Sequence, residues 1–257
     1  MAEYLVENKF FYNTKDTLEL ISFLERDNII TEVKKGFYKF VKVKEIEGNI
    51  SYNKNEKRKI FNVFEHTLSE ILEYEQEHSK KQINVPFILY HLTEQVIKRG
   101  GYETQGIFRV STSQKKLEFY AQKFAEHQSY SLEISDDAHV PANLLKHFLR
   151  CIPEPAIPDY SKAMIFANQA PTPQVMDDFL DSLPITNQNV IKFLSQFIST
   201  FSGHEERTKM NFDSLAILFT PILLVNPTTN VLALVVSQQI EIAFIKNLFN
   251  YINNRSN

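Results

Sequence analysis

The residue whose type and setting best suit chemistry is Arg109, which follows an unusually glycine-rich stretch. Three of the six glycines lie between residues 100 and 106, in the segment GGYETQGIFRVS. Clustered glycines permit backbone shapes that other residues resist, and the apolar Ile107, Phe108 and Val110 are expected to hold this loop in a core. Arg109 would then project from a rigid base, where its planar, permanently charged guanidinium suits phosphate oxygens. The alternative is an ordinary surface arginine paired with Glu103.

A second group of cations lies in the segment NLLKHFLRCIPEP. Lys146 and Arg150 are four residues apart, so on a helix they share one face, opposite an apolar face. Two cations on one face repel each other unless an anion or an acid balances them. If the two cations have only a structural role, a nearby acid such as Glu154 or Asp159 is expected to balance them. Otherwise the two cations support the glycine-rich loop or face an acidic partner.

Several common catalytic motifs are absent from the sequence. It has no GxxxxGK[ST] or GxGxxG phosphate loop, no GxSxG elbow and no HExxH pair. The seven histidines show no ligand spacing with cysteine or carboxylates, so no metal site is expected. The lone cysteine, Cys151, excludes an internal disulfide and is expected to be a buried structural thiol rather than a nucleophile. The sequence therefore offers no self-contained active site, and any catalysis would act on a group that a partner brings.

Helices must position these residues, because helical periodicity runs from about residue 60 onward and predicts an all-α region of about eight or nine helices. Thr67-Leu68-Ser69-Glu70 has the spacing of a capping box. The expected helices run from Pro86 to Gly100, from Ser111 or Ser113 to about His127, from Pro141 past Leu149, over 159–168, 173–183 and 187–202, over 212–219 ending before Pro221, and over 232–252.

The first part of the chain has a different pattern. The charged run NKNEKRK, residues 53–59, is the best linker candidate, so we predict a boundary near residue 58 and two parts, 1–58 and 59–257. Residues 17–27 have helical spacing, residues 37–44 mostly alternate apolar and charged as a strand does, and Lys35-Gly36 suits a hairpin turn. This small α+β segment is compatible with a winged-helix-like unit. Its row of lysines is expected to be a solvated hairpin face rather than a surface for anions.

Composition sets the broad class of the protein. At 257 residues and 43% hydrophobic content, the chain is long and apolar enough to bury a large core. A net charge of −3 provides no bulk basic field, so no nucleic-acid partner is expected. No apolar run reaches about 18 residues and the first residues lack a signal-peptide core, so the expectation is a soluble cytoplasmic protein with no transmembrane segment.

Three segments together resemble one known family. Residues 106–111, GIFRVS, resemble the GIFRxSG signature of the Rho GTPase-activating protein (RhoGAP) family. Residues 144–155 are similar to that family's LLKxFLRxLPEPL block, and residues 209–224 resemble its KMxxxNLAxxFGPNLL block. The blocks occur in the family's order, and the similarity covers about residues 60–255. Residues 1–55 lie outside it.

The resemblance implies an all-helical RhoGAP-type domain that accelerates GTP hydrolysis on a Rho- or Rac-type small GTPase in its GTP state. It implies that Arg109 is an arginine finger, while GTP and Mg²⁺ belong to the partner and the chain has no cofactor of its own. Recruitment to a membrane surface would come through the partner. The remaining implied site residues are the finger loop, Gly106, Ile107, Phe108 and Ser111, and the support or partner-binding residues, Lys146, Arg150, Asp213 and Ser214.

The sequence departs from the family pattern at several positions. Ser214 stands where the family has an interface asparagine, and the neighbouring Asp213 cannot donate a hydrogen bond as an amide does. Thr220, Ile222 and Thr112 replace a glycine, an asparagine and a glycine of the pattern. A second hypothesis is therefore a non-catalytic GTPase-binding or scaffold module on the same fold. A third, a nucleic-acid or adaptor protein acting through residues 1–55, is disfavoured by the net negative charge.

Overall fold

The computed structural model describes residues 30–34, 37–40, 61–78, 83–127 and 130–255. The chain divides into two compact units, Met1–Lys59 and Ile60–Asn257. In the first unit, strand β1 (Ile30–Lys34) pairs antiparallel with β2 (Phe37–Phe40), with Ile30 opposite Phe40. The predicted strand thus begins at residue 37 as expected. The predicted helix at 17–27 and the boundary near residue 58 lie outside the described residues, and the winged-helix-like unit stays a prediction.

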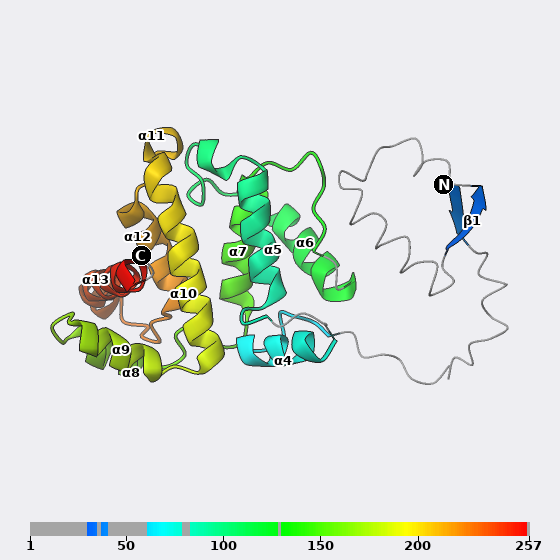
Figure 1. The fold of residues 1–257 in the computed structure, drawn as a ribbon. Coiled ribbons are helices and arrows are strands. Elements are labelled where there is room, and N and C mark those ends of the chain that lie inside the picture. The colour runs from blue at the N-terminus through cyan, green and yellow to red at the C-terminus, as the bar shows by residue number, and fades with distance from the viewer. Residues whose placement is uncertain (1–29, 35–36, 41–60, 79–82, 128–129, 256–257) are drawn as a thin grey trace. The chain divides into compact units, whose positions relative to one another are not determined.

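The second unit is built from helices, as predicted (Figure 1). Nine α-helices of eight or more residues occur among its described residues, together with the four-residue α11 and the 3₁₀ helices η1 and η2. In chain order they are α4 (Leu68–His78), α5 (Phe87–Lys98), η1 (Gly101–Glu103), α6 (Gln114–His127), α7 (His139–Cys151), α8 (Tyr160–Ala167), α9 (Pro173–Asp181), α10 (Ile185–Ser199), η2 (Thr200–His204), α11 (Glu205–Thr208), α12 (Phe212–Leu223) and α13 (Val231–Arg255).

Local side-chain caps explain where several helices begin. The predicted capping box at α4 is confirmed, because the Thr67 N–H donates to Glu70 Oε2 at 2.8 Å and the Glu70 N–H donates to Thr67 Oγ1 at 3.3 Å. Ser113 caps α6 through the Lys116 N–H at 3.4 Å. At the other end of a helix, Gly100 follows α5 with a φ of 79°, a left-handed conformation that stops the helix.

The apolar faces of these helices meet in one core that runs from Val63 to Ile252. Helix α7 packs against α5, α6 and α12, while α10 and α12 both pack against α13 (Figure 1). The core therefore joins α7 to α10 and α12, which are the elements that hold the Arg109 loop.

Helix α12 extends further than the sequence predicted. It does not end before Pro221 but continues to Leu223. Proline has no N–H, so the helix loses one backbone bond at this position. The next turn is still closed, because the Leu224 N–H donates to the Thr220 carbonyl at 2.9 Å. Ile222 and Leu223 are fully buried, and their packing offsets the missing bond.

Helix α13 is longer than the predicted 232–252. Among the described residues it is the one helix whose length and composition would suffice to cross a membrane. Polar residues at 237–239 and Glu241 interrupt its apolar sequence. From Glu241 onward one face of the helix is buried in the core, at Phe244, Leu248 and Phe249 among others.

Candidate functional site

The Arg109 loop, residues 104–112, turns sharply at Gly106. This glycine has a φ of 70°, and a Cβ added there would stand 2.9 Å from Val110 Cγ2. The Gly106 N–H donates to the Thr208 carbonyl at 2.6 Å, and the Gly106 carbonyl accepts from the N–H groups of Arg109 and Val110, each at 2.9 Å. The first residue of the signature thus ties the loop to the end of α11.

Phe108 anchors the loop in the core. Its φ of 65° is unusual for a residue other than glycine, and such a conformation costs free energy. The ring is fully buried and meets the rings of Phe197, Phe201 and Phe219 edge-on, with centroids 5.9, 5.4 and 5.5 Å away. These rings come from α10, η2 and α12, so three separate elements fix the residue next to Arg109.

Lys146 supports the same residue from α7. Its side chain is 6% exposed, and its Nζ donates to the Phe108 carbonyl. Burial, together with the charge of Arg150, lowers the pKa of Lys146 to about 8. Lys146 was predicted to support the loop, and its hydrogen bond to Phe108 is a direct contact with the loop. Because the side chain is buried, the ammonium group lies under the loop rather than on the surface.

Asn143 holds the other side of the loop and was not among the residues predicted from the sequence. This buried side chain donates through Nδ2 to the Val110 carbonyl at 2.8 Å, with Thr112 Oγ1 at 3.4 Å. The one signal in the sequence is an amide one turn before Lys146 on an apolar helix. Its partner is 33 residues away, so local spacing does not reveal the contact.

Arg109 itself projects into solvent. Its Nη2 and Nε lie 3.7 and 3.8 Å from the point where a Cβ at Gly106 would stand, so the guanidinium lies over the glycine. No hydrogen bond or ion pair of its side chain is found within the described part of the chain. The expected alternative partner, Glu103, pairs with Arg207 instead. The expectation that Val110 lies in the core was wrong: its side chain is exposed, and only its backbone is held.

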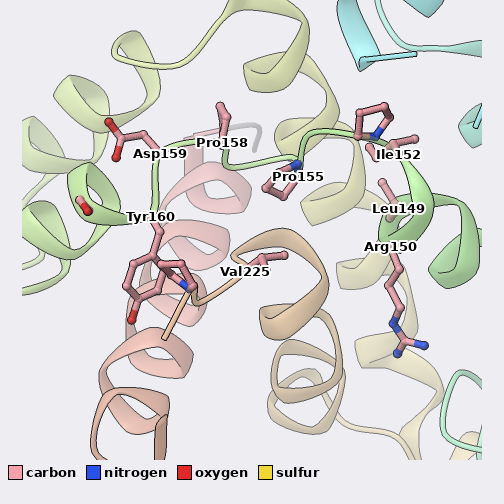
Figure 2. Close-up of a pocket in the computed structure, with 11 residues that line it drawn as sticks. Leu149, Arg150, Ile152, Pro155, Pro158, Asp159, Tyr160 and Val225 are labelled. Carbon is pink, nitrogen blue, oxygen red and sulfur yellow. The ribbon is translucent and has the colours of Figure 1, made fainter. Parts of the chain in front are cut away.

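Arg150 lies one turn further along α7, at the edge of a pocket of about 560 Å³. Figure 2 shows its guanidinium and the Asp159 carboxylate on opposite sides of this pocket. Asp159 caps α8, since its Oδ1 accepts from the Lys162 N–H at 2.9 Å. Across the described ranges, neither Asp159 nor Glu154 forms an ion pair with Arg150. The remaining residues that line the pocket are Leu149, Ile152, Pro153, Pro155, Pro158, Tyr160, Ser161, Val225 and Pro227.

The expectation of a buried Cys151 was wrong. The thiol is exposed, because Cys151 lies with Arg150 on the solvent side of the last turn of α7. Its Sγ is 3.7 Å from Nε2 of His147, and partial burial raises the pKa of the thiol.

The first turn of α12 carries Asp213 and Ser214, and among the described residues neither forms a hydrogen bond or ion pair with the Arg109 loop. The Ser214 N–H donates to Asn211 Oδ1 at 2.8 Å, while Asp213 pairs with Lys246 of α13 at 2.7 Å. Asp213 is therefore already engaged in an ion pair. Two further departures, Thr220 and Ile222, are 2% and 1% exposed, so they face the core.

Ser111 is exposed and Ile107 is fully buried, so the loop residues divide into a buried base and an exposed tip. Among the described residues there is no group of three or more histidine, cysteine, aspartate or glutamate side chains that could hold a metal ion.

Comparison with known proteins identifies the fold. The family model of the RhoGAP domain matches residues 86–228, more than half of the chain. The chain belongs to the RhoGAP family. Its Arg109 loop, its α7 segment and its α12 segment all lie inside the matched region. The predicted all-helical RhoGAP fold is therefore confirmed.

The relatives differ from the chain in length. Human Rho GTPase-activating protein 1 is 31% identical over 157 residues, which is 60% of this chain but 36% of the relative. GTPase activating protein homolog 2 of Dictyostelium discoideum is 30% identical over 166 residues, or 63% of this chain and 18% of the relative. The crystal structure of human Rho GTPase activating protein 15 has a TM-score of 0.62 at 25% identity, covering 75% of this chain and 90% of that one. The chain thus spans about a third or less of the curated relatives it matches.

Proposed function

We propose that this RhoGAP chain accelerates GTP hydrolysis on a Rho-family small GTPase by inserting Arg109 into the partner's active site. The observation that carries the proposal is the contrast within the Arg109 loop. Its backbone and base are held by Thr208, Asn143, Lys146 and the ring contacts of Phe108. The Arg109 guanidinium, in contrast, is exposed and pairs with no described residue. An arginine held in this way can enter a partner's pocket without first breaking an internal ion pair.

The proposed mechanism uses charge neutralisation. As the bond to the γ-phosphate breaks, negative charge grows on the phosphate oxygens, and the guanidinium stabilises it with two parallel hydrogen bonds. GTP, Mg²⁺ and the water-positioning glutamine belong to the partner. Such a finger raises the rate by roughly 10³ to 10⁵, which corresponds to about 4–7 kcal/mol of barrier.

Pre-organisation of the loop adds to this effect. Ordering a mobile loop on binding would cost about 0.5–1.5 kcal/mol for each immobilised side chain. Here the neighbours of Arg109 are already fixed by the folded domain, so mainly the arginine side chain has to be ordered. The partner is proposed to be in its GTP state, because that state carries the γ-phosphate on which a finger acts.

A second candidate function is a binding module without catalysis. It is favoured by Ser214, which is shorter than the asparagine of the family pattern, and by Asp213, which is tied to Lys246. The two functions differ in one measurable respect, since a binding module would bind the GTPase without changing its hydrolysis rate.

The test is single-turnover hydrolysis by a small panel of GTP-loaded Rho-, Rac- and Ras-type proteins. We expect the chain to stimulate at least one Rho- or Rac-type member, and Arg109→Ala to lower that stimulation by about 10³ or more with little change in partner binding. Arg255→Ala, which removes an exposed arginine at the far end of α13, is the matched control and should keep wild-type rates. Binding without stimulation by the wild type would instead support the binding module.

A further inference from the structure

The first turns of α13 expose a continuous apolar surface. The six residues Val231 to Val236 (VLALVV) are all exposed, and the valines and leucines among them range from 37% to 78%. Monomeric proteins seldom leave such a cluster in water, and larger exposed apolar patches usually mark a binding surface. We call residues 231–236 the α13 tip.

Exposed side chains occur on more than one side of the helix: Val231, Leu234 and Val235 line an open pocket beside α12, while Leu232 and Val236 are among the most exposed residues of the tip. Successive residues in an α-helix are about 100° apart, so six consecutive residues point in all directions around the axis. A protein groove covers one face of a helix, with contacts at i, i+3, i+4 and i+7. A helix segment with apolar side chains all around its axis is instead buried fully only in surroundings that are apolar on every side, such as a protein core or a lipid layer.

The chemistry around the tip matches a lipid layer better than a charged protein surface. Between Asp213 and Glu241 the sequence contains no acidic, basic or histidine residue. The segment just before the tip, NPTTN, has small uncharged polar side chains. Such groups are compatible with the hydrated headgroup level, while valine and leucine favour the region of the acyl chains.

The rest of α13 holds the tip in a fixed position. From Glu241 onward one face of the helix packs in the core, so α13 does not cross a membrane while the domain is folded. Glu241 also accepts hydrogen bonds from Tyr160 of α8 and from Asn226, which precedes the tip, each at 2.7 Å. An interfacial helix places its apolar side chains about 5–10 Å into the boundary between headgroups and acyl chains.

We propose that the α13 tip inserts into the interfacial layer of a phospholipid membrane. The attachment is apolar rather than electrostatic, because residues 231–236 carry no charge. It is independent of the GTPase-activating function, since Arg109 plays no part in it.

The insertion can be followed with a single fluorophore, because the chain has no tryptophan. Leu232→Trp in the full chain places one tryptophan at the tip. Ile165→Trp on α8, where the native isoleucine is 65% exposed, is the matched control. With zwitterionic phosphatidylcholine vesicles we expect a blue-shifted emission at residue 232 and quenching by brominated acyl chains, with neither at residue 165. No shift at residue 232, or equal shifts at both positions, would overturn the proposal.

A second measurement tests the energetic source of binding. Leu232→Ser combined with Val236→Ser should weaken partitioning of the full chain onto these vesicles by about tenfold or more. Ile165→Ser combined with Ile185→Ser removes comparable exposed apolar surface elsewhere and should leave partitioning unchanged. Added salt should have little effect.

Two other outcomes would contradict lipid insertion. Binding that requires anionic lipid and disappears in salt would assign membrane contact to lysines, such as those of residues 34–44. Lipid-free self-association that the Leu232/Val236 double variant abolishes, measured by sedimentation, would assign the tip to a second copy of the chain.

Discussion

Two positions with positive φ, Gly106 and Phe108, shape the backbone before Arg109. Both have positive φ, but they tolerate it for different reasons. Gly106 has no Cβ to clash, whereas Phe108 is held by its buried ring and by Lys146 on its carbonyl. The strain of the loop is thus offset by packing in the core, and loss of either support should disturb the arginine.

Replacement of Gly106 tests this dependence. Gly106→Ala should lower the free energy of unfolding by about 1–3 kcal/mol, because alanine disfavours positive φ and its Cβ would press on Val110. Stimulation of the GTPase should fall more than partner binding does. Gly203→Ala is the control, since nothing lies within 4 Å of its added Cβ. Equal denaturation midpoints and hydrolysis rates for the two variants would contradict the role of Gly106.

The lowered pKa of Lys146 makes the stability of the fold depend on pH. Its pKa is lowered from 10.5 to about 8 in the folded state. Between those values the unfolded chain holds a proton that the folded chain has released, so the free energy of unfolding rises with pH. The free energy of unfolding of the wild type, minus that of Lys146→Met, should therefore rise from pH 8 to pH 10.5 and stay constant below pH 7. A flat difference throughout, in urea titrations at each pH, would show that Lys146 keeps its usual pKa.

The exposure of a single residue was predictable where it depends only on neighbouring residues in the sequence. Arg109 on a glycine-rich loop is exposed as expected, because the turn at Gly106 is local. The sequence misplaced Cys151 and Val110 because the side on which each lies depends on how α7 and the loop rotate against the core. It missed Asn143 and the phenylalanine cluster because their contacts join residues far apart in the chain.

At the level of elements, the helix starts were easier to predict than the helix ends. The capping box at Thr67 and the cap at Ser113 act within three residues, so their spacing is visible in the sequence. The end of α12 depends instead on burial of its last turn, which outweighs the presence of Pro221. Proline is a local signal, and it misled the prediction because tertiary packing decides that boundary.

Helix α8 and the segment between α12 and α13 meet at Glu241, a buried acid of α13 with no described cation beside it. Tyr160 of α8 donates to its Oε1, while Asn226 lies at 2.7 Å from both the Tyr160 hydroxyl and Oε1. Tyr160→Phe removes one donor and one acceptor, so it should lower the free energy of unfolding by about 1–3 kcal/mol. Tyr90→Phe, at a 57% exposed tyrosine, should change it by less than about 0.5 kcal/mol. Equal effects in denaturant titrations would show that the Glu241 contacts do not stabilise the fold.

For the whole molecule, the family match and the core define the same part of the chain. The core runs from Val63 to Ile252, around the matched residues 86–228, so α4 and α13 extend the matched segment at both ends. Helix α13 packs on α10 and α12, which carry Phe197 and Phe219 of the loop's anchor. The elements beyond the matched segment therefore contribute to holding Arg109.

A fragment of residues 60–257 should fold by itself, because every described core residue lies within it. We expect the fragment to show helical circular dichroism and one cooperative thermal transition. Its unfolding should expose a surface in proportion to its size, so its denaturant m-value should be that of a domain of about 200 residues. A further truncation to residues 60–230, which removes α13, is the informative comparison, since it deletes Phe244, Leu248 and Phe249 from the core. That fragment should lose the cooperative transition. A cooperative transition in the shorter fragment, or none in the longer one, would show that the core is not organised as a single unit around α13.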